Sequence, residues 1–159
     1  MARRSKQGPS KTGFIMGTRN YSFQASVDTI IANTEKRMLM VMKQSLLNTI
    51  NEAQTPVSKG GKMRIDTGFL RASGQASLNG MPTGPARKPT DAAPGAYAYN
   101  PSEVEATIGK LKFGSTLFFG WTANYARYRE AYDGFLISAM QNWQQTVNNV
   151  IAEAKRRFG

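Results

Sequence analysis

The stretch that decides the fold runs from position 120 to position 130 and reads Gly120-Trp121-Thr122-Ala123-Asn124-Tyr125-Ala126-Arg127-Tyr128-Arg129-Glu130. It follows an apolar run at residues 116–119, and we interpret it as a turn that leaves a buried strand and enters a helix. Trp, Tyr and Arg dominate protein contact surfaces because each combines apolar area with a polar group. The stretch has no histidine, no cysteine and no pair of carboxylates, so we expect it to make contacts rather than to catalyse a reaction.

Long amphipathic helices are expected towards both ends of the chain. Ser26 is a good N-cap for the first, with Asp28 in the turn that follows, and Pro56 ends it. Apolar or small residues recur along one stripe of this helix: Val27, Ile30, Ile31, Thr34, Met38, Val41, Met42, Ser45, Thr49 and Ala53. The last helix is expected over residues 135–158, after a break at Asp133-Gly134.

Little of the chain between these helices suits a strand. Residues 74–79 predict a weak strand, and residues 116–121 predict a mostly buried one. The sequence therefore predicts an α+β fold, in which a small antiparallel sheet is flanked by the long N-terminal and C-terminal amphipathic helices.

Two shorter helical turns complete the expected elements. Asp66 is positioned to cap the first, which would place Phe69 and Leu70 inward and Arg71 outward. Ser102 is positioned to cap the second.

The basic charge of the chain is concentrated in two segments. The formal net charge is +11; residues 1–19 carry five basic residues and no acidic one, and residues 55–90 carry six basic residues and one acidic one. Such segments suit phosphate backbones or acidic partner surfaces, although a purely solubilising role is the alternative. The candidate contacts with DNA or an acidic partner are Arg3, Arg4, Lys6, Lys11, Arg87 and Lys88.

The chain is expected to form one domain with a tail. Residues 1–22 are polar and contain several glycines, and we interpret them as a disordered basic N-terminal arm. Residues 23–159 form the single predicted domain. Within it, residues 80–101 hold five of the seven prolines and predict a long loop without a core element.

The composition argues against several classes of function. The chain contains no cysteine and no histidine, so it lacks the commonest metal ligands and the commonest general base. We therefore expect no enzyme, no catalytic residues, no metal site and no cofactor. No apolar run approaches the roughly 20 residues of a membrane span, and no hydrophobic signal core follows the basic N-terminus. We expect a protein of the cytoplasm with no membrane partner.

Three motifs resemble those of a known family. They are Asp66-Thr67-Gly68-Phe69-Leu70-Arg71, Lys110-Leu111-Lys112-Phe113-Gly114-Ser115-Thr116 and Gly120-Trp121-Thr122-Ala123-Asn124-Tyr125-Ala126-Arg127. In this order, after a long N-terminal helix, they resemble the neck, or tail-completion, proteins of long-tailed double-stranded DNA phages. The resemblance covers residues 24–158 in element order. One departure is that many members carry a glycine-rich loop and a proline before the last helix, where this chain has only Tyr132-Asp133-Gly134.

The resemblance implies structural work in a virion. The family forms homo-oligomeric rings, hexamers or dodecamers, at the head–tail junction, assembled in the bacterial host cytoplasm. Such a ring joins a head-closure or connector protein to the tail terminator or tail tube, with double-stranded DNA in its channel. The family has no known catalytic residues to carry over to this chain.

The candidate subunit interface consists of aromatic residues and arginines. Its members are Phe69, Arg71, Tyr97, Tyr99, Trp121, Tyr125, Arg127, Tyr128 and Arg129. We expect Trp121 and Tyr125 to be packed, and Arg127 and Arg129 to face partners. The alternative function is a stand-alone protein that binds nucleic acid without sequence preference, with Trp121, Tyr125 and Tyr128 stacking on bases.

Overall fold

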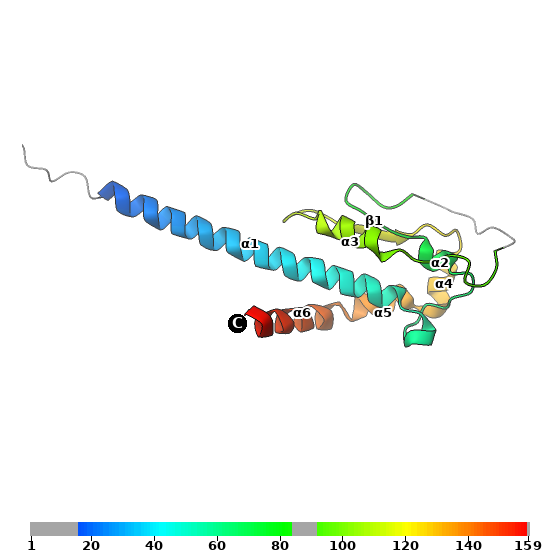
Figure 1. Cartoon of the computed structure of the whole chain (residues 1–159). Helices are drawn as coiled ribbons and strands as arrows, with labels where there is room; N and C mark the ends of the chain where they lie inside the picture. The colour runs from blue at the N-terminus through cyan, green and yellow to red at the C-terminus, as the bar shows by residue number, and fades with distance from the viewer. Residues whose placement is uncertain (1–15, 84–91, 159) are drawn as a thin grey trace, which may run out of the picture. The chain divides into compact units, whose positions relative to one another are not determined.

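The computed structural model describes residues 16–83 and 92–158 (Figure 1). Its elements, in chain order, are α1 (Met16–Gln54), the 3-10 helix η1 (Val57–Lys59), α2 (Phe69–Ala72), β1 (Gly74–Ser77), α3 (Pro101–Gly109), β2 (Phe118–Trp121), α4 (Ala126–Asp133), α5 (Phe135–Gln141) and α6 (Trp143–Phe158). The predicted α+β class, with a small antiparallel sheet and long helices towards both ends, is confirmed. The chain divides after Arg37 into two compact units.

The first unit contains the N-terminal part of α1. The helix begins at Met16 and passes through Ser26, so the predicted N-cap at Ser26 is wrong. The reason is that residues 18–25 contain no proline or glycine to stop a helix, and Gln24 donates to Asp28 Oδ1 one turn later at 2.9 Å. Residues 16–22 of the predicted arm therefore belong to α1, and residues 1–15 lie outside the described residues.

The second unit contains the sheet. Strand β1 pairs with β2 in antiparallel register, from Gly74 opposite Trp121 to Ser77 opposite Phe118. Both strands are shorter than the predicted windows at 74–79 and 116–121. Strand β1 ends early because the Asn79 amide donates to Ser77 Oγ at 3.2 Å, which turns the chain out of the ladder.

Two hydrophobic clusters form the core of the second unit. Met63, Leu70, Ala123 and Phe135 make the first. Ile50, Val104 and Ile108 make the second, which joins the C-terminal part of α1 to α3. Within this unit, α3 and β1 lie on one side of the C-terminal part of α1, and α5 and α6 lie on the other (Figure 1). The clusters thus lie around the end of α1 that leads to Pro56.

The predicted C-terminal helix is interrupted. Gly134 adopts a left-handed conformation, φ 62°, and separates α4 from α5 where the break at Asp133-Gly134 was expected. The prediction of one helix over residues 135–158 is wrong, because a second interruption falls at Asn142. The Asn142 side chain donates to Glu52 Oε1 on α1 at 2.6 Å, a contact that sequence periodicity does not reveal.

Both predicted caps of the short helices are displaced. Gly68, φ 84°, is the N-cap of α2 in place of Asp66, and its carbonyl accepts from the Ala72 amide at 2.9 Å. A Cβ at Gly68 would lie 2.1 Å from the Tyr97 carbonyl oxygen, so only glycine fits there. In α3 the cap is Asn100, whose side chain accepts from the Ser102 amide at 3.1 Å.

Candidate assembly surface

Trp121 packs within its own chain at the end of β2. Its ring meets Phe119 edge-on at 5.0 Å between centroids and Phe135 at 4.9 Å. Its indole Nε1 donates to Gln54 Oε1 at 3.2 Å. Both the ring and the polar group of Trp121 therefore have partners inside the second unit, as expected for a packed residue.

Gln54, which the sequence reasoning missed, joins α1 to α2 and β2. Its side chain is buried, and its Nε2 donates to the Arg71 carbonyl oxygen at 3.2 Å. In return, Arg71 Nε donates to the Gln54 carbonyl oxygen at 2.8 Å. A Cβ at Gly74 would lie 2.3 Å from Gln54 Nε2, so the strand passes close to this amide. The one sequence signal was a long polar side chain at the end of a helix, directly before Thr55-Pro56.

Arg71 does not point outward, which corrects the prediction made for the short helical turn. Its guanidinium lies 5.3 Å from the centroid of the Tyr99 ring, in addition to its bond with Gln54. Burial raises the pKa of the Tyr99 hydroxyl above its ordinary value and outweighs the neighbouring Gln54 amide and Arg71 guanidinium, which favour the charged form. Arg71 and Tyr99 thus serve the fold of their own chain.

Phe69 brings two of the resembling motifs together. Its ring meets Tyr97 edge-on at 5.1 Å and lies 6.4 Å from the Tyr125 ring. The Tyr97 amide donates to the Thr67 carbonyl oxygen at 2.9 Å, which fixes the end of the long loop against the turn before α2. These aromatic interface candidates contact one another within one copy of the chain.

Helix α4 carries the candidates that remain exposed. Arg127 and Tyr128 are exposed. Tyr132 lies one turn after Tyr128 and is 86 % exposed. Tyr132 was missed as a candidate because it lies beyond the 120–130 stretch, next to the expected helix break.

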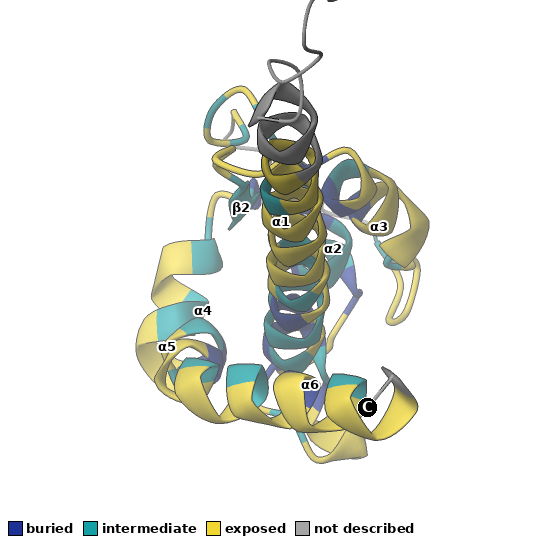
Figure 2. Cartoon of the chain, turned by 90° about the vertical axis from the view of Figure 1, so that its left-hand side faces the viewer, coloured by how far each residue is buried: buried dark blue, intermediate teal, exposed yellow. Residues whose placement is uncertain are grey.

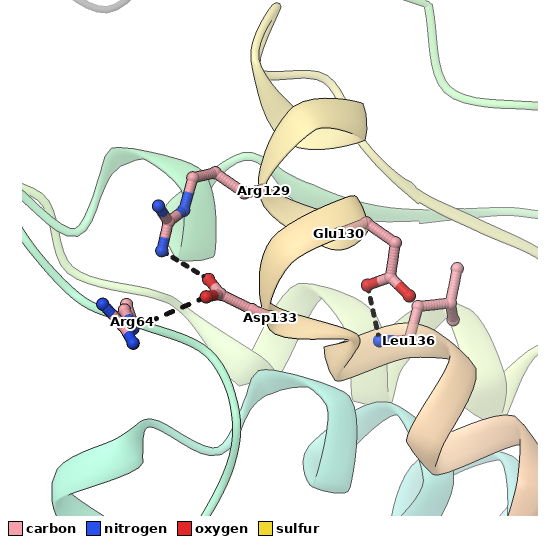
Figure 3. Close-up of polar contacts among 5 residues, drawn as sticks. All are labelled: Arg64, Arg129, Glu130, Asp133 and Leu136. Carbon is pink, nitrogen blue, oxygen red and sulfur yellow. Dashed lines mark hydrogen bonds and ion pairs between the residues drawn. The ribbon is translucent and has the colours of Figure 1, made fainter.

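A cluster of charged side chains, which includes the carboxylates of Glu130 and Asp133, lies at the junction between α4 and α5 (Figure 3). Arg129 donates to Asp133 Oδ2 at 2.6 Å, and Arg64 Nε lies 3.6 Å from Asp133 Oδ1. The Asp133 side chain is 4 % exposed, whereas that of Arg64 is 76 % exposed. Glu130 accepts from the amides of Leu136 at 2.8 Å and Ile137 at 2.9 Å, so it caps α5 across Gly134.

An open pocket of about 760 Å³ lies beside this cluster. Its lining includes Arg64, Ile65, Asp66, Arg71, Tyr125 and Arg129, and we name it the arginine pocket. A second, smaller hollow of about 340 Å³ shares Arg64 and Ile65 and also touches Val57. Since Val57 and Ile65 are exposed, the surface at Arg64 combines positive charge with apolar area.

The described side chains of the first unit, residues 23–37, form what we name the α1 arm. It exposes large apolar residues at helical spacing: Phe23 is 70 % exposed, Ile30 64 % and Ile31 51 %. In Figure 2, α1 is yellow along this part and changes to teal and dark blue towards Gln54. Among the side chains of the arm, Val27 alone is half-buried, and the others are exposed.

The six basic candidates for DNA or partner contact are not placed by the structure. Arg3, Arg4, Lys6, Lys11, Arg87 and Lys88 lie outside the described residues. Within residues 16–83 and 92–158, no group of three or more acidic residues, histidines or cysteines could hold a metal ion. The described helices include none that is long and apolar enough to cross a membrane.

Comparisons with known proteins identify no relative. No family model matches the chain, and neither a curated protein nor a solved structure is significantly similar to it.

Proposed function

We propose that this protein is a structural subunit of the phage head–tail junction. Copies of it form a ring around the DNA channel and join the connector, on the head side, to the tail. The observation that carries this proposal is the α1 arm, whose large apolar side chains Phe23, Ile30 and Ile31 are exposed in the described part of the chain.

The exposed apolar side chains of the arm favour contact with a partner. The arm is the N-terminal part of the 39-residue α1, and most helical stability in proteins comes from packing of an apolar face. Burying one Ile or Phe side chain contributes about 1.5–3 kcal/mol. Phe23, Ile30 and Ile31 together therefore offer enough apolar area to drive association between subunits.

The arrangement of the resembling motifs supports the same proposal. The turn at residues 66–71 and the junction at residues 120–130 are distant in sequence, yet Phe69 lies against Tyr125. The Ala123 amide also donates to Ser73 Oγ at 3.1 Å. The motifs thus meet as one packed unit, which is what a shared structural role would require of them.

The alternative, stand-alone nucleic-acid binding through stacked aromatics, receives less support. Both Trp121 and Tyr125 contact rings of their own chain, so part of each ring surface already serves internal packing. Among the residues named for stacking, Tyr128 is exposed. We therefore propose dispersed contact with DNA in a ring channel rather than recognition of single strands.

The proposal is tested by measuring the mass of the assembled protein. We expect native mass spectrometry and light scattering to detect closed multimers of the full chain, alone or with the connector protein of the same phage. Ile30→Asp should weaken association by about tenfold or more, because it places a charge in the apolar stripe.

Thr29→Asp is the matched control for this variant. It adds the same charge at the adjacent exposed position, which lies off the stripe, and should assemble as the unchanged protein does. A chain that stays monomeric beside a folded connector protein would contradict the proposed function.

A further inference from the structure

A ring places a geometric demand on its subunits. Two identical patches that meet each other produce a closed pair, whereas a ring of more than two copies needs two different patches that fit together. The apolar stripe of the α1 arm is one patch. Under the proposed function, another part of the chain must receive it.

The arm carries a second feature beside its stripe. Asp28, Ile31 and Glu35 follow one another at i, i+3 and i+7 and therefore share one face of the helix. Asp28 and Glu35 are the acidic residues of the arm, and both are exposed. This face combines an apolar side chain with two carboxylates.

The surface at the arginine pocket has the complementary composition. Arg64 extends from it with most of its side chain in solvent, and Arg129 and Arg71 lie deeper in the lining. Ile65 and Val57 supply exposed apolar area next to Arg64. Two carboxylates accompany the three arginines: Asp66 is exposed in the lining, and the Asp133 side chain is buried beside it, so positive charge remains in excess at the pocket.

We propose that the α1 arm of one copy docks on the arginine pocket of the next copy. The carboxylates of Asp28 and Glu35 face Arg64 at the rim, and Ile31 packs on Ile65. This inference rests on the proposed function and names the contact that closes the ring. Exposed ion pairs add little affinity, so the charges set direction and register while the apolar area holds the copies together.

The absence of cysteine from the chain permits a direct test. A Glu35→Cys, Arg64→Cys double variant is treated with a short bifunctional thiol crosslinker and analysed on a denaturing gel. Docking of arm to pocket predicts a ladder of linked multimers. Each single variant should remain unlinked, and an equimolar mixture of the two should give linked pairs.

The control places the second thiol elsewhere on a basic surface. Glu35→Cys combined with Lys110→Cys, at the exposed end of α3, should give no ladder. Linked pairs of the Glu35→Cys variant alone would show that arms pair with each other and would overturn the inference. Failure of the Glu35→Cys, Arg64→Cys chain to form intermolecular links would overturn it as well.

Charge exchange provides an independent measurement. Glu35→Arg and Arg64→Glu should each weaken assembly at least about tenfold, because like charges then face each other. Mixing the two variants should restore assembly in rings of alternating copies, since each arm finds an opposite charge. Normal assembly of either variant alone would remove the docking proposal only, whereas a chain that never assembles would remove the proposed function itself.

Discussion

At the scale of single residues, Gln54 organises the junction more than the aromatics that surround it. Its side-chain amide is shared between the Arg71 carbonyl oxygen and the Trp121 indole, and its own carbonyl oxygen accepts from Arg71. A buried amide with partners at both ends fixes the distance between the elements it joins. The position of Trp121 therefore depends on the last turn of α1.

We expect Gln54→Ala to lower the free energy of unfolding by roughly 3 kcal/mol. The change leaves a cavity and removes the partner of the Trp121 indole. Urea denaturation measures this loss, and Gln75→Ala, at an exposed position of β1, serves as the control with a change of about 0.5 kcal/mol or less. Equal stability of both variants would show that water or neighbouring groups replace the amide.

From the sequence it was possible to predict which residue types form the candidate assembly surface, but not all of the contacts that they make. The packing of Trp121 and Tyr125 was expected from their apolar neighbours, and the structure places both rings against other aromatics. The inward direction of Arg71 was not predictable, because its partners Gln54 and Tyr99 are distant in sequence. Whether Arg127 and Arg129 face partners stays a prediction.

At the scale of elements, Glu130 determines how α4 passes into α5. Its carboxylate spans the left-handed Gly134 and accepts from the first amides of α5, which would otherwise have no partner within their helix. A carboxylate at this position also faces the positive end of the helix. The junction between α4 and α5 therefore depends on this side chain together with the left-handed Gly134.

We expect Glu130→Ala to destabilise the protein by about 1–2 kcal/mol, as for the loss of a helix cap. Thermal unfolding followed by circular dichroism measures the effect. The control is Glu153→Ala on α6, which removes an exposed pair with Arg157 and should cost about 0.5 kcal/mol or less. If both variants unfold at the same temperature, the cap contributes nothing beyond a surface ion pair.

Local signals predicted most elements and misplaced their ends. The apolar periodicity identified the long helices, and Asp133-Gly134 identified the break before α5. The sequence did not predict that α1 begins at Met16, because a Ser such as Ser26 can lie inside a helix as well as cap one. It did not predict the break at Asn142 either, because the Asn142 contact joins segments that are distant in sequence. Strand ends depended in the same way on a turn at Ser77.

At the scale of the whole molecule, both hydrophobic clusters lie after Arg37. Their members range from Ile50 to Phe135, and none comes from the α1 arm. The α+β class was predictable because it follows from the alternation of helical and strand patterns. The ring expected from the resemblance stays a prediction, because a single chain reveals only which of its described surfaces are exposed.

We expect a shortened chain of residues 38–159 to keep its cooperative unfolding. Its free energy of unfolding should lie within about 1 kcal/mol of that of the full chain, because the clusters remain intact. Its assembly should be lost. Denaturation and light scattering on the same sample measure the two properties, and a loss of cooperative unfolding would show that the arm belongs to the fold.

The exposed α1 arm has a consequence for the purity of any ring. If the proposed docking holds, a copy whose arm has been clipped by a protease would keep its pocket, so it could still accept the arm of one neighbour but could not dock on the next. Such a copy would prevent the ring from closing. A small fraction of clipped protein would therefore leave a much larger fraction of rings incomplete. Protection of the arm from proteases soon after synthesis would then favour complete rings.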